Sequence, residues 1–201
     1  MSDYGTVIPL GGASIIATDD HPGYAPGRFY VPFGQGAAFA GAASATGIAS
    51  FAFGVIKRRI SISKLGARIT TGSAGNFQLA VYGHDVASAA PSGLMRATGS
   101  ISTATAALVD GSLTSAVVLE PGFYWFGQQV DNTGAIFMSQ GASTLSFVST
   151  IGSQSGAISS SVTQASGLST PATFGSWPAS LVGAAFTELP TRAPLVQFQV
   201  A

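Results

Sequence analysis

The carboxylates and histidines are the side chains with which this chain could do acid–base chemistry. The sequence holds eight carboxylates and two histidines, which are Asp3, Asp19, Asp20, Asp85, Asp110, Glu120, Asp131, Glu188, His21 and His84. Glycoside hydrolysis needs two carboxyl groups on either side of one sugar linkage. Asp85 and Asp131 meet this requirement only if the fold brings their loops together, and no Gly-x-Ser-x-Gly elbow or triad spacing is present. The sequence therefore predicts a protein that is not an enzyme.

Metal binding is the second chemistry that these residues suggest. Asp19, Asp20 and His21 are contiguous and offer oxygen and imidazole ligands, but no spaced partner accompanies them. They are typical of a solvated turn before Pro22, and the pair at 84–85 has the same pattern. The chain has no cysteine, which excludes disulfides and thiolate metal sites. We expect no metal and no cofactor.

Aromatic side chains among hydroxyls suggest carbohydrate binding. Trp177 and Phe174 lie in the segment Phe-Gly-Ser-Trp-Pro, where a ring suits either stacking on a sugar or anchoring the loop. The set of candidate carbohydrate-binding residues is Trp177, Phe174, His84, Asp85 and Asp131. In the run 123–126, alternate rings face opposite sides of a strand. We expect two of them in the core and the other two under a loop or subunit, or exposed as a sugar platform.

Five of the eight basic residues fall close together, at Lys57, Arg58, Arg59, Lys64 and Arg68. On a strand, positions 57 and 59 face one way while 58 and 64 face the other, so no single basic stripe forms. No aromatic residues alternate with them, unlike single-strand nucleic-acid binders, and the net charge is zero. The cluster indicates a solvated sheet edge, with a negatively charged partner surface as the alternative. We expect no nucleic-acid partner.

The segment 56–83 shows the elements that position these residues. Apolar and polar residues alternate from 56 to 62, and the alternation changes parity after Lys64, which predicts a β-bulge. A turn of small residues follows at 71–76, and a second alternating run starts at Phe77. The pattern predicts a β-hairpin-like unit.

The rest of the chain repeats this pattern. About ten short strands with turn residues between them, such as Asp110-Gly111 and Glu120-Pro-Gly, predict an all-β chain. The fold class we expect is an antiparallel β-sandwich, jelly-roll-like, over residues 28–201. A long Ser/Gly-rich excursion is expected at about 150–180. Residues 1–27, rich in proline and glycine, predict a short extended N-terminal attachment arm.

Two long runs carry few or no charges. The run 29–56 is dominated by Gly, Ala and Ser, so it does not predict a membrane span, and the N-terminus has no signal-peptide pattern. No Asp, Glu, Lys, Arg or His occurs from 132 to 187. One interpretation is that hydroxyl and amide groups keep this surface soluble. The other is that sister subunits cover it, since uncharged polar groups are less costly to desolvate than ions. We expect a homo-oligomer and no membrane insertion.

Several motifs occur in an order that points to a family. They are Arg28-Phe-Tyr with Pro32, the run 64–75, the run 77–82, Pro91-Ser-Gly-Leu-Met-Arg96 and Leu119-Glu-Pro-Gly-Phe-Tyr-Trp125. Together they resemble the β-sandwich domain of structural proteins in tailed bacteriophages and phage-like particles, found in head or tail fibres and spikes. The resemblance covers about residues 28–130, and the final strand more loosely. The chain departs from it at 83–90, where the Asp- or Asn-rich loop is missing.

The resemblance implies a virion structural protein, located in the virion and often trimeric. Residues 1–27 would then bind other virion proteins, and the rigid domain would be displayed close to the host surface, with a host polysaccharide as the expected ligand. One alternative is an architectural capsid decoration or collar without a ligand. The other is a polysaccharide-degrading enzyme.

Overall fold

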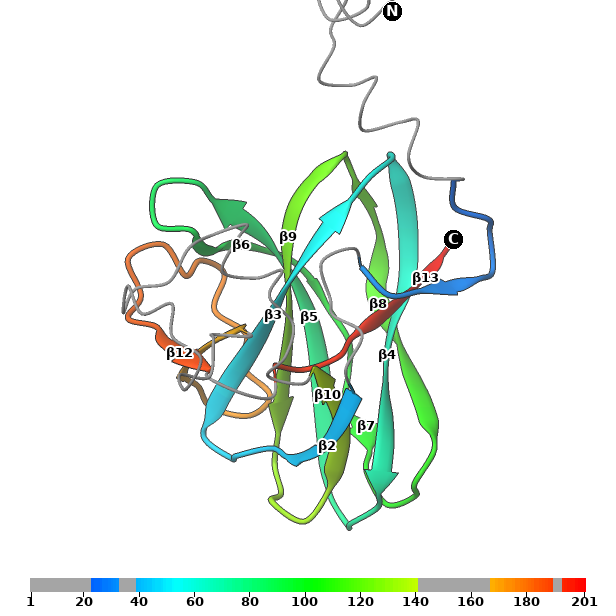
Figure 1. Cartoon of the computed structure of the whole chain (residues 1–201), viewed down its shortest axis with the longest axis vertical. Helices are drawn as coiled ribbons and strands as arrows, with labels where there is room; N and C mark the ends of the chain where they lie inside the picture. Colours follow the sequence, from blue (N-terminus) through cyan, green and yellow to red (C-terminus); the bar gives the residue numbers. More distant parts are fainter. Residues whose placement is uncertain (1–22, 33–38, 141–166, 190–192) are drawn as a thin grey trace, which may run out of the picture.

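Two antiparallel β-sheets pack face to face in the computed structural model, which describes residues 23–32, 39–140, 167–189 and 193–201 (Figure 1). No helix occurs in these four segments. The all-β sandwich predicted from the alternating pattern is confirmed.

The strands divide between the sheets as follows. The first sheet contains β1 (Phe29–Tyr30), β2 (Phe39–Ala43), β4 (Ile60–Thr71), β8 (Leu108–Leu119), β10 (Ile136–Gln140) and β13 (Gln197–Val200). The second sheet contains β3 (Ile48–Ile56), β5 (Asn76–Asp85), β6 (Ala90–Ala97), β7 (Ile101–Ser102), β9 (Gly122–Val130), β11 (Gly167–Pro171) and β12 (Thr187–Leu189).

Eight of these strands follow the jelly-roll order. Neighbours in the first sheet run β2-β10-β4-β8, and neighbours in the second run β3-β9-β5-β6. The chain passes from one sheet to the other between β2 and β3, β3 and β4, β4 and β5, β8 and β9, and β9 and β10, which is how a jelly roll closes two sheets around one core. β11 and β12 extend the second sheet next to β3. In the first sheet, β13 pairs with the same edge of β4 as β10 does, and β1 pairs with β13.

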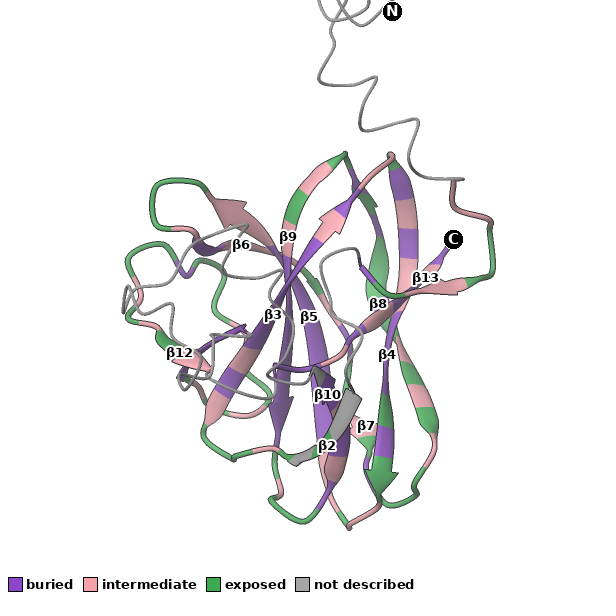
Figure 2. Ribbon diagram, in the orientation of Figure 1, coloured by how far each residue is buried: buried purple, intermediate pink, exposed green. Residues whose placement is uncertain are grey.

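The main core fills the space between the sheets. Its fully buried side chains include Ile62 and Leu65 from β4, Phe77 from β5, Phe126 from β9 and Phe198 from β13. Figure 2 shows that buried residues occur along the strands of both sheets. Burial of this apolar area is the dominant favourable term in folding.

The parity change after Lys64 is a β-bulge, as predicted. The pairing of β4 with β8 shifts register between Ile62 and Lys64, and the pairing with β13 shifts at the same place. Residues 60 and 62 are buried before the bulge, and residues 65, 67 and 69 are buried after it. The bulge keeps one long strand facing the same core on both sides of the irregularity.

The predicted hairpin over 56–83 is wrong. β4 and β5 lie in different sheets, and the turn 72–75 carries the chain across the core. Their apolar residues face the same core from opposite sides, so alternation is satisfied without any hydrogen bonding between the two strands. Period-two alternation identifies which face is buried but does not identify the pairing partner.

The predicted turn at Asp110-Gly111 is also wrong, because both residues lie inside β8 opposite Gly66 and Leu65. The Asp110 carboxylate forms a salt bridge with Lys64, with 3.1 Å between Oδ1 and Nζ. A Cβ at Gly111 would lie 2.6 Å from Cδ1 of Ile101, so the glycine permits close packing. The other predicted turn, at 120–121, does separate β8 from β9.

A second apolar layer covers the outer face of the second sheet. This cover is the loop 172–186 between β11 and β12, whose Trp177 and Leu181 pack with Phe51, Tyr82 and Trp125 of β3, β5 and β9. Leu168 of β11 belongs to the same apolar cluster. Part of the excursion predicted at 150–180 is therefore this cover; residues 150–166 of it lie outside the described residues.

Residues 23–27 and the C-terminal residue Ala201 lie together at one end of the sandwich. The Tyr24 ring contacts the Phe198 ring at 5.7 Å, and its hydroxyl accepts a hydrogen bond from the Lys57 amide at 3.4 Å. The Ala201 amide donates to the Ser61 carbonyl at 2.8 Å. Residues 1–22 of the predicted arm lie outside the described residues, and residues 23–27 pack on the sandwich.

Truncation of Leu65 tests the core. Leu65 is fully buried beside the bulge, so Leu65→Ala removes packing that the jelly roll cannot replace and is expected to lower the free energy of unfolding by about 2–5 kcal/mol. Leu108→Ala is the matched control, because Leu108 is 54% exposed and its loss is expected to change stability by about 0.5 kcal/mol or less. Urea denaturation measures both, and equal effects would contradict the assignment of the core.

Candidate functional site

The structure distributes the five candidate carbohydrate residues over three places. His84 and Asp85 end β5, Asp131 lies beside Asn76 at its start, and Phe174 and Trp177 lie in the cover over the outer face. The ten residues of β5 span about 30 Å at ~3.3 Å per residue. Asp85 and Asp131 therefore cannot flank one glycosidic bond, which requires carboxyl groups within about 10 Å.

Asp131 ties two turns together. Its carboxylate accepts hydrogen bonds from the Asn76 amide at 2.6 Å and from the Asn76 side chain at 3.0 Å. Burial acts to raise the pKa of Asp131, but the hydrogen bonds from Asn76 and Asn132 outweigh it and hold the pKa below its ordinary value. This carboxylate joins the β4–β5 turn to the β9–β10 turn, which is a structural role.

Asp85 organises the β5–β6 turn. Its carboxylate accepts hydrogen bonds from the Ser88 hydroxyl at 2.6 Å and from the Ala87 amide at 3.1 Å. These two bonds, the Ser88 bond first, lower the pKa of Asp85. Ala89 then adopts a φ of 51°, a left-handed conformation that a turn supported in this way can hold.

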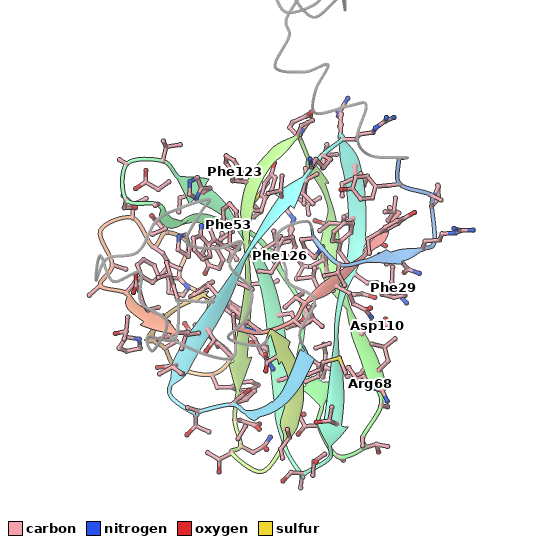
Figure 3. All side chains as sticks on the ribbon, in the orientation of Figure 1. Phe29, Phe53, Arg68, Asp110, Phe123 and Phe126 are labelled. Carbon is pink, nitrogen blue, oxygen red and sulfur yellow. The ribbon has the colours of Figure 1, made fainter. Side chains whose placement is uncertain are left out.

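His84 belongs to an aromatic cluster on the outer face of the second sheet. Trp125 donates its indole N–H to Nδ1 of His84 at 3.1 Å, and the imidazole meets the rings of Phe53 and Phe123 at 5.9 and 5.6 Å. Phe53 and Phe123 stack at 5.3 Å (Figure 3). Because Nδ1 accepts this bond, the neutral imidazole carries its proton on Nε2. Burial lowers the pKa of His84, and the charge of Asp85 opposes this only in part.

Trp177 anchors the cover to the sheet. Its ring meets Phe51 at 6.4 Å and Tyr82 at 6.1 Å. The Tyr82 hydroxyl donates to the Pro178 carbonyl at 2.7 Å, and Gln129 donates to the Ser176 carbonyl at 3.2 Å. Burial raises the pKa of Tyr82 well above its usual range. Of the two interpretations of Trp177, this geometry supports the loop anchor.

The rings of the tetrad 123–126 alternate between the two faces of the strand, as predicted. Tyr124 and Phe126 face the main core, while Phe123 and Trp125 face the outer side of the second sheet. Trp125 and Phe126 are fully buried on opposite faces, Trp125 under the cover and Phe126 between the sheets. Tyr124 is half-buried, and its hydroxyl donates to the Glu120 carbonyl at 2.9 Å. Phe123 remains 47% exposed. The sequence did not single out Phe53 and Tyr82 as partners of these rings, although their parity on β3 and β5 puts them on the same outer face.

The basic cluster is divided, and its predicted strand placement is wrong in part. Residues 57–59 form the β3–β4 turn and are not part of a strand. Arg59 pairs with Glu120 at 3.0 Å and Lys64 with Asp110 at 3.1 Å, while Arg68 lies exposed on the first sheet. Both members of the Arg59 pair are largely exposed, so this bridge adds little stability.

The two ends of the sandwich differ in charge. The terminal end, where residues 23 and 201 lie, includes the turns 57–59, 86–89 and 120–121. The loop end consists of the turns 44–47, 72–75, 103–107 and 131–135. Lys57, Arg58, Arg59, Asp85 and Glu120 lie at or beside the terminal end. In the four turns of the loop end, Asp131 is the one charged side chain, and Asn76 and Asn132 already occupy its oxygens.

Hydrogen bonds lock the turns of the loop end to one another. Thr103 is fully buried and exchanges main-chain bonds with Ser73 and Gly75, each at 2.9 Å. Its hydroxyl donates to the Ser73 carbonyl at 2.8 Å and accepts from the Asn132 amide at 3.0 Å. The loop end is therefore a rigid, hydroxyl-rich surface.

Within the described segments, no three His, Cys, Asp or Glu side chains gather where a metal ion could bind, and Asp19, Asp20 and His21 lie outside these segments. No helix in them has the length and apolar character that a membrane crossing requires. Neither a protein-family model nor a curated protein sequence matches the chain. Function is therefore inferred from the fold and from the placement of the side chains.

Acidification tests the His84 contact. The folded-state pKa of His84 lies below its ordinary 6.5, so the unfolded chain binds the proton more readily. The stability that the neutral imidazole contributes is present above pH 6.5 and is lost as the pH falls through the lower folded-state pKa. His84→Gln keeps an acceptor for Trp125 and removes the titration. We expect urea denaturation between pH 7.5 and 5 to show a smaller loss in this variant than in the parent chain, and equal losses would contradict the prediction.

Removal of the Trp177 ring tests the anchor. Trp177→Ala is expected to lower the free energy of unfolding by about 1–3 kcal/mol, which is less than for a fully buried tryptophan, and to expose the segment 173–180 to protease. Phe174→Ala is the control, because Phe174 has no ring contact among the described residues. If Trp177→Ala leaves stability and cleavage unchanged while Phe174→Ala alters them, the anchor assignment is wrong.

Proposed function

We propose that this chain is a non-catalytic display domain of a virion-type particle. In this proposal the terminal end attaches to the particle and the loop end faces outward. The observation that carries the proposal is the difference between the two ends, because one holds residues 23 and 201 and five charged side chains, while the turns of the other are rigid and carry one. The resemblance of the motifs at 28–130 to phage fibre and spike domains supports the assignment of the particle.

The terminal end has the features of a contact surface. Val86 is 85% exposed and Phe123 is 47% exposed, so apolar side chains lie close to the charged turns. Apolar residues bordered by polar residues are typical of protein interfaces. A segment preceding Gly23 would leave the domain at this end, as the arm hypothesis for residues 1–27 requires.

The loop end suits contact with a neutral polysaccharide. Hydroxyl and amide groups on rigid turns can replace the hydrogen bonds of sugar hydroxyls to water at little cost in ordering. The absence of free charge in its four described turns favours a neutral glycan over an anionic one. The separation of Asp85 from Asp131 supports a binding role over hydrolysis.

A homotrimer remains part of the proposal. The uncharged run 132–187 supports it only in part, because residues 167–187 already form part of the second sheet of their own chain and its cover. The resemblance to trimeric fibre and spike domains carries the rest. Light scattering of the purified chain, with an expected mass of three chains, tests the stoichiometry, and a stable monomer would contradict it.

Cysteine labelling tests the orientation of the domain, since the chain has no native cysteine. Val86→Cys labels the terminal end and Thr105→Cys labels the loop end; both positions are exposed in the isolated domain. Each variant is compared as a purified chain and in particles sedimented from the cells that produce it. We expect a maleimide reagent to label both variants in the purified chain but only Thr105→Cys in the particles. Equal labelling in the particles, or particles that lack the chain, would overturn the proposal.

A further inference from the structure

A small cavity opens between the two sheets beside the β2–β3 turn, on the side of the loop end. Its volume is about 170 Å³, and its walls come from β2, β3, β9, β10 and the segments that precede β13. Ligand pockets for drug-sized molecules usually exceed about 300 Å³, so this cavity matches a single small ring.

Gln128 lies in the wall of the cavity and carries a buried donor that is unsatisfied. Its neighbours on the inner face of β9, Phe126 and Val130, belong to the apolar core, whereas position 128 carries an amide that is only 5% exposed. Within the described part of the chain, Nε2 of Gln128 has no hydrogen-bond partner. A buried polar group left unpaired costs about 1–3 kcal/mol. Other buried side-chain atoms of the described residues are also unpaired, and Gln128 differs from them because it lines this cavity, where a bound molecule could supply the partner.

The walls of the cavity combine two kinds of surface. Hydroxyl-bearing Ser44 and Ser50 lie on the same cavity as Gln128, and Phe137, Ile48 and Pro194 provide apolar contact. Among the described residues that line it, none is charged. This combination fits a molecule that is neutral, has hydroxyl groups on its edge and has an apolar face.

We propose that this cavity binds one neutral sugar residue, with the Gln128 side chain turning so that its unpaired amide donates to a sugar oxygen, and with the ring lying against the apolar wall. The inference rests on the proposed function, because it names the place where the outward half of the domain would hold a neutral glycan. It assigns the glycan to Gln128 and Ser50, neither of which is among the five candidates suggested by the sequence.

Titration of the isotopically labelled full chain tests the site. The probes are the methyl glycosides of glucose, galactose, N-acetylglucosamine and rhamnose, with glucuronic acid as the anionic comparison. We expect at least one neutral glycoside to shift the side-chain amide signals of Gln128 saturably, while glucuronic acid does not. If no neutral glycoside shifts these signals at millimolar concentration, or if glucuronic acid alone does, the proposal is overturned, and the Gln128 amide is then satisfied by water.

Three variants locate the binding. Gln128→Leu replaces the unpaired amide with an apolar side chain that suits a core position, so the fold is expected to survive and affinity to fall by about tenfold or more. Ser50→Ala is a smaller change that is expected to weaken binding severalfold. Gln197→Leu is the matched control, because Gln197 also has an amide nitrogen without a partner but lies on the outer side of the first sheet.

Affinity that is unchanged in both Gln128→Leu and Ser50→Ala would place binding elsewhere and overturn the site. Loss of affinity in Gln197→Leu alone would do the same. The result is independent of the labelling experiment on particles. A domain that faces outward but binds no glycoside would be an architectural decoration, and a domain that binds glycoside without facing outward would overturn the display function alone.

Discussion

The burial of both faces of one sheet is the constraint on which the rest of this structure depends. β3, β5 and β9 send alternate side chains into two separate apolar clusters, one between the sheets and one under the cover. Phe51, Tyr82 and Trp125 would be exposed without the cover, residues 172–186. Large apolar area exposed on a soluble domain is unfavourable, so the cover is required by these three rings. The cover in turn fixes Trp177 against the sheet.

The predictable part of the fold is the part that local alternation determines. The parity change at Lys64 reports the bulge because a single strand must keep its apolar residues on one core. The pairing of strands depends on contacts far apart in sequence, and for this reason the crossing between β4 and β5 looked like a hairpin. Asp110-Gly111 misled for a related reason, since the local turn preference of this pair yields to Lys64 and Ile101, which only the fold brings near.

The candidate site was harder to predict than the fold. Residue type indicated what Asp85, Asp131 and Trp177 could do, but each is already used by its own neighbourhood: two carboxylates hold turns, and the indole holds the cover. The two carboxylates are already hydrogen-bonded and have little left to offer a ligand, and the Trp177 ring is packed against the sheet. Gln128 gave no signal in the sequence, because a glutamine in an aromatic strand looks like an outward-facing residue until the register places it inside.

The difference between these two kinds of polar residue supports the functional assignment. A sequence that specifies one fold usually satisfies each buried polar group within the chain, and departures from this rule concentrate where function requires them. Thr103 obeys the rule with four hydrogen bonds, and the result is a rigid loop end. Gln128 departs from it on the same half of the domain, at the wall of the cavity. A leucine would pack well in the core at that position. In the proposed site the amide is retained instead because it would recognise a sugar oxygen.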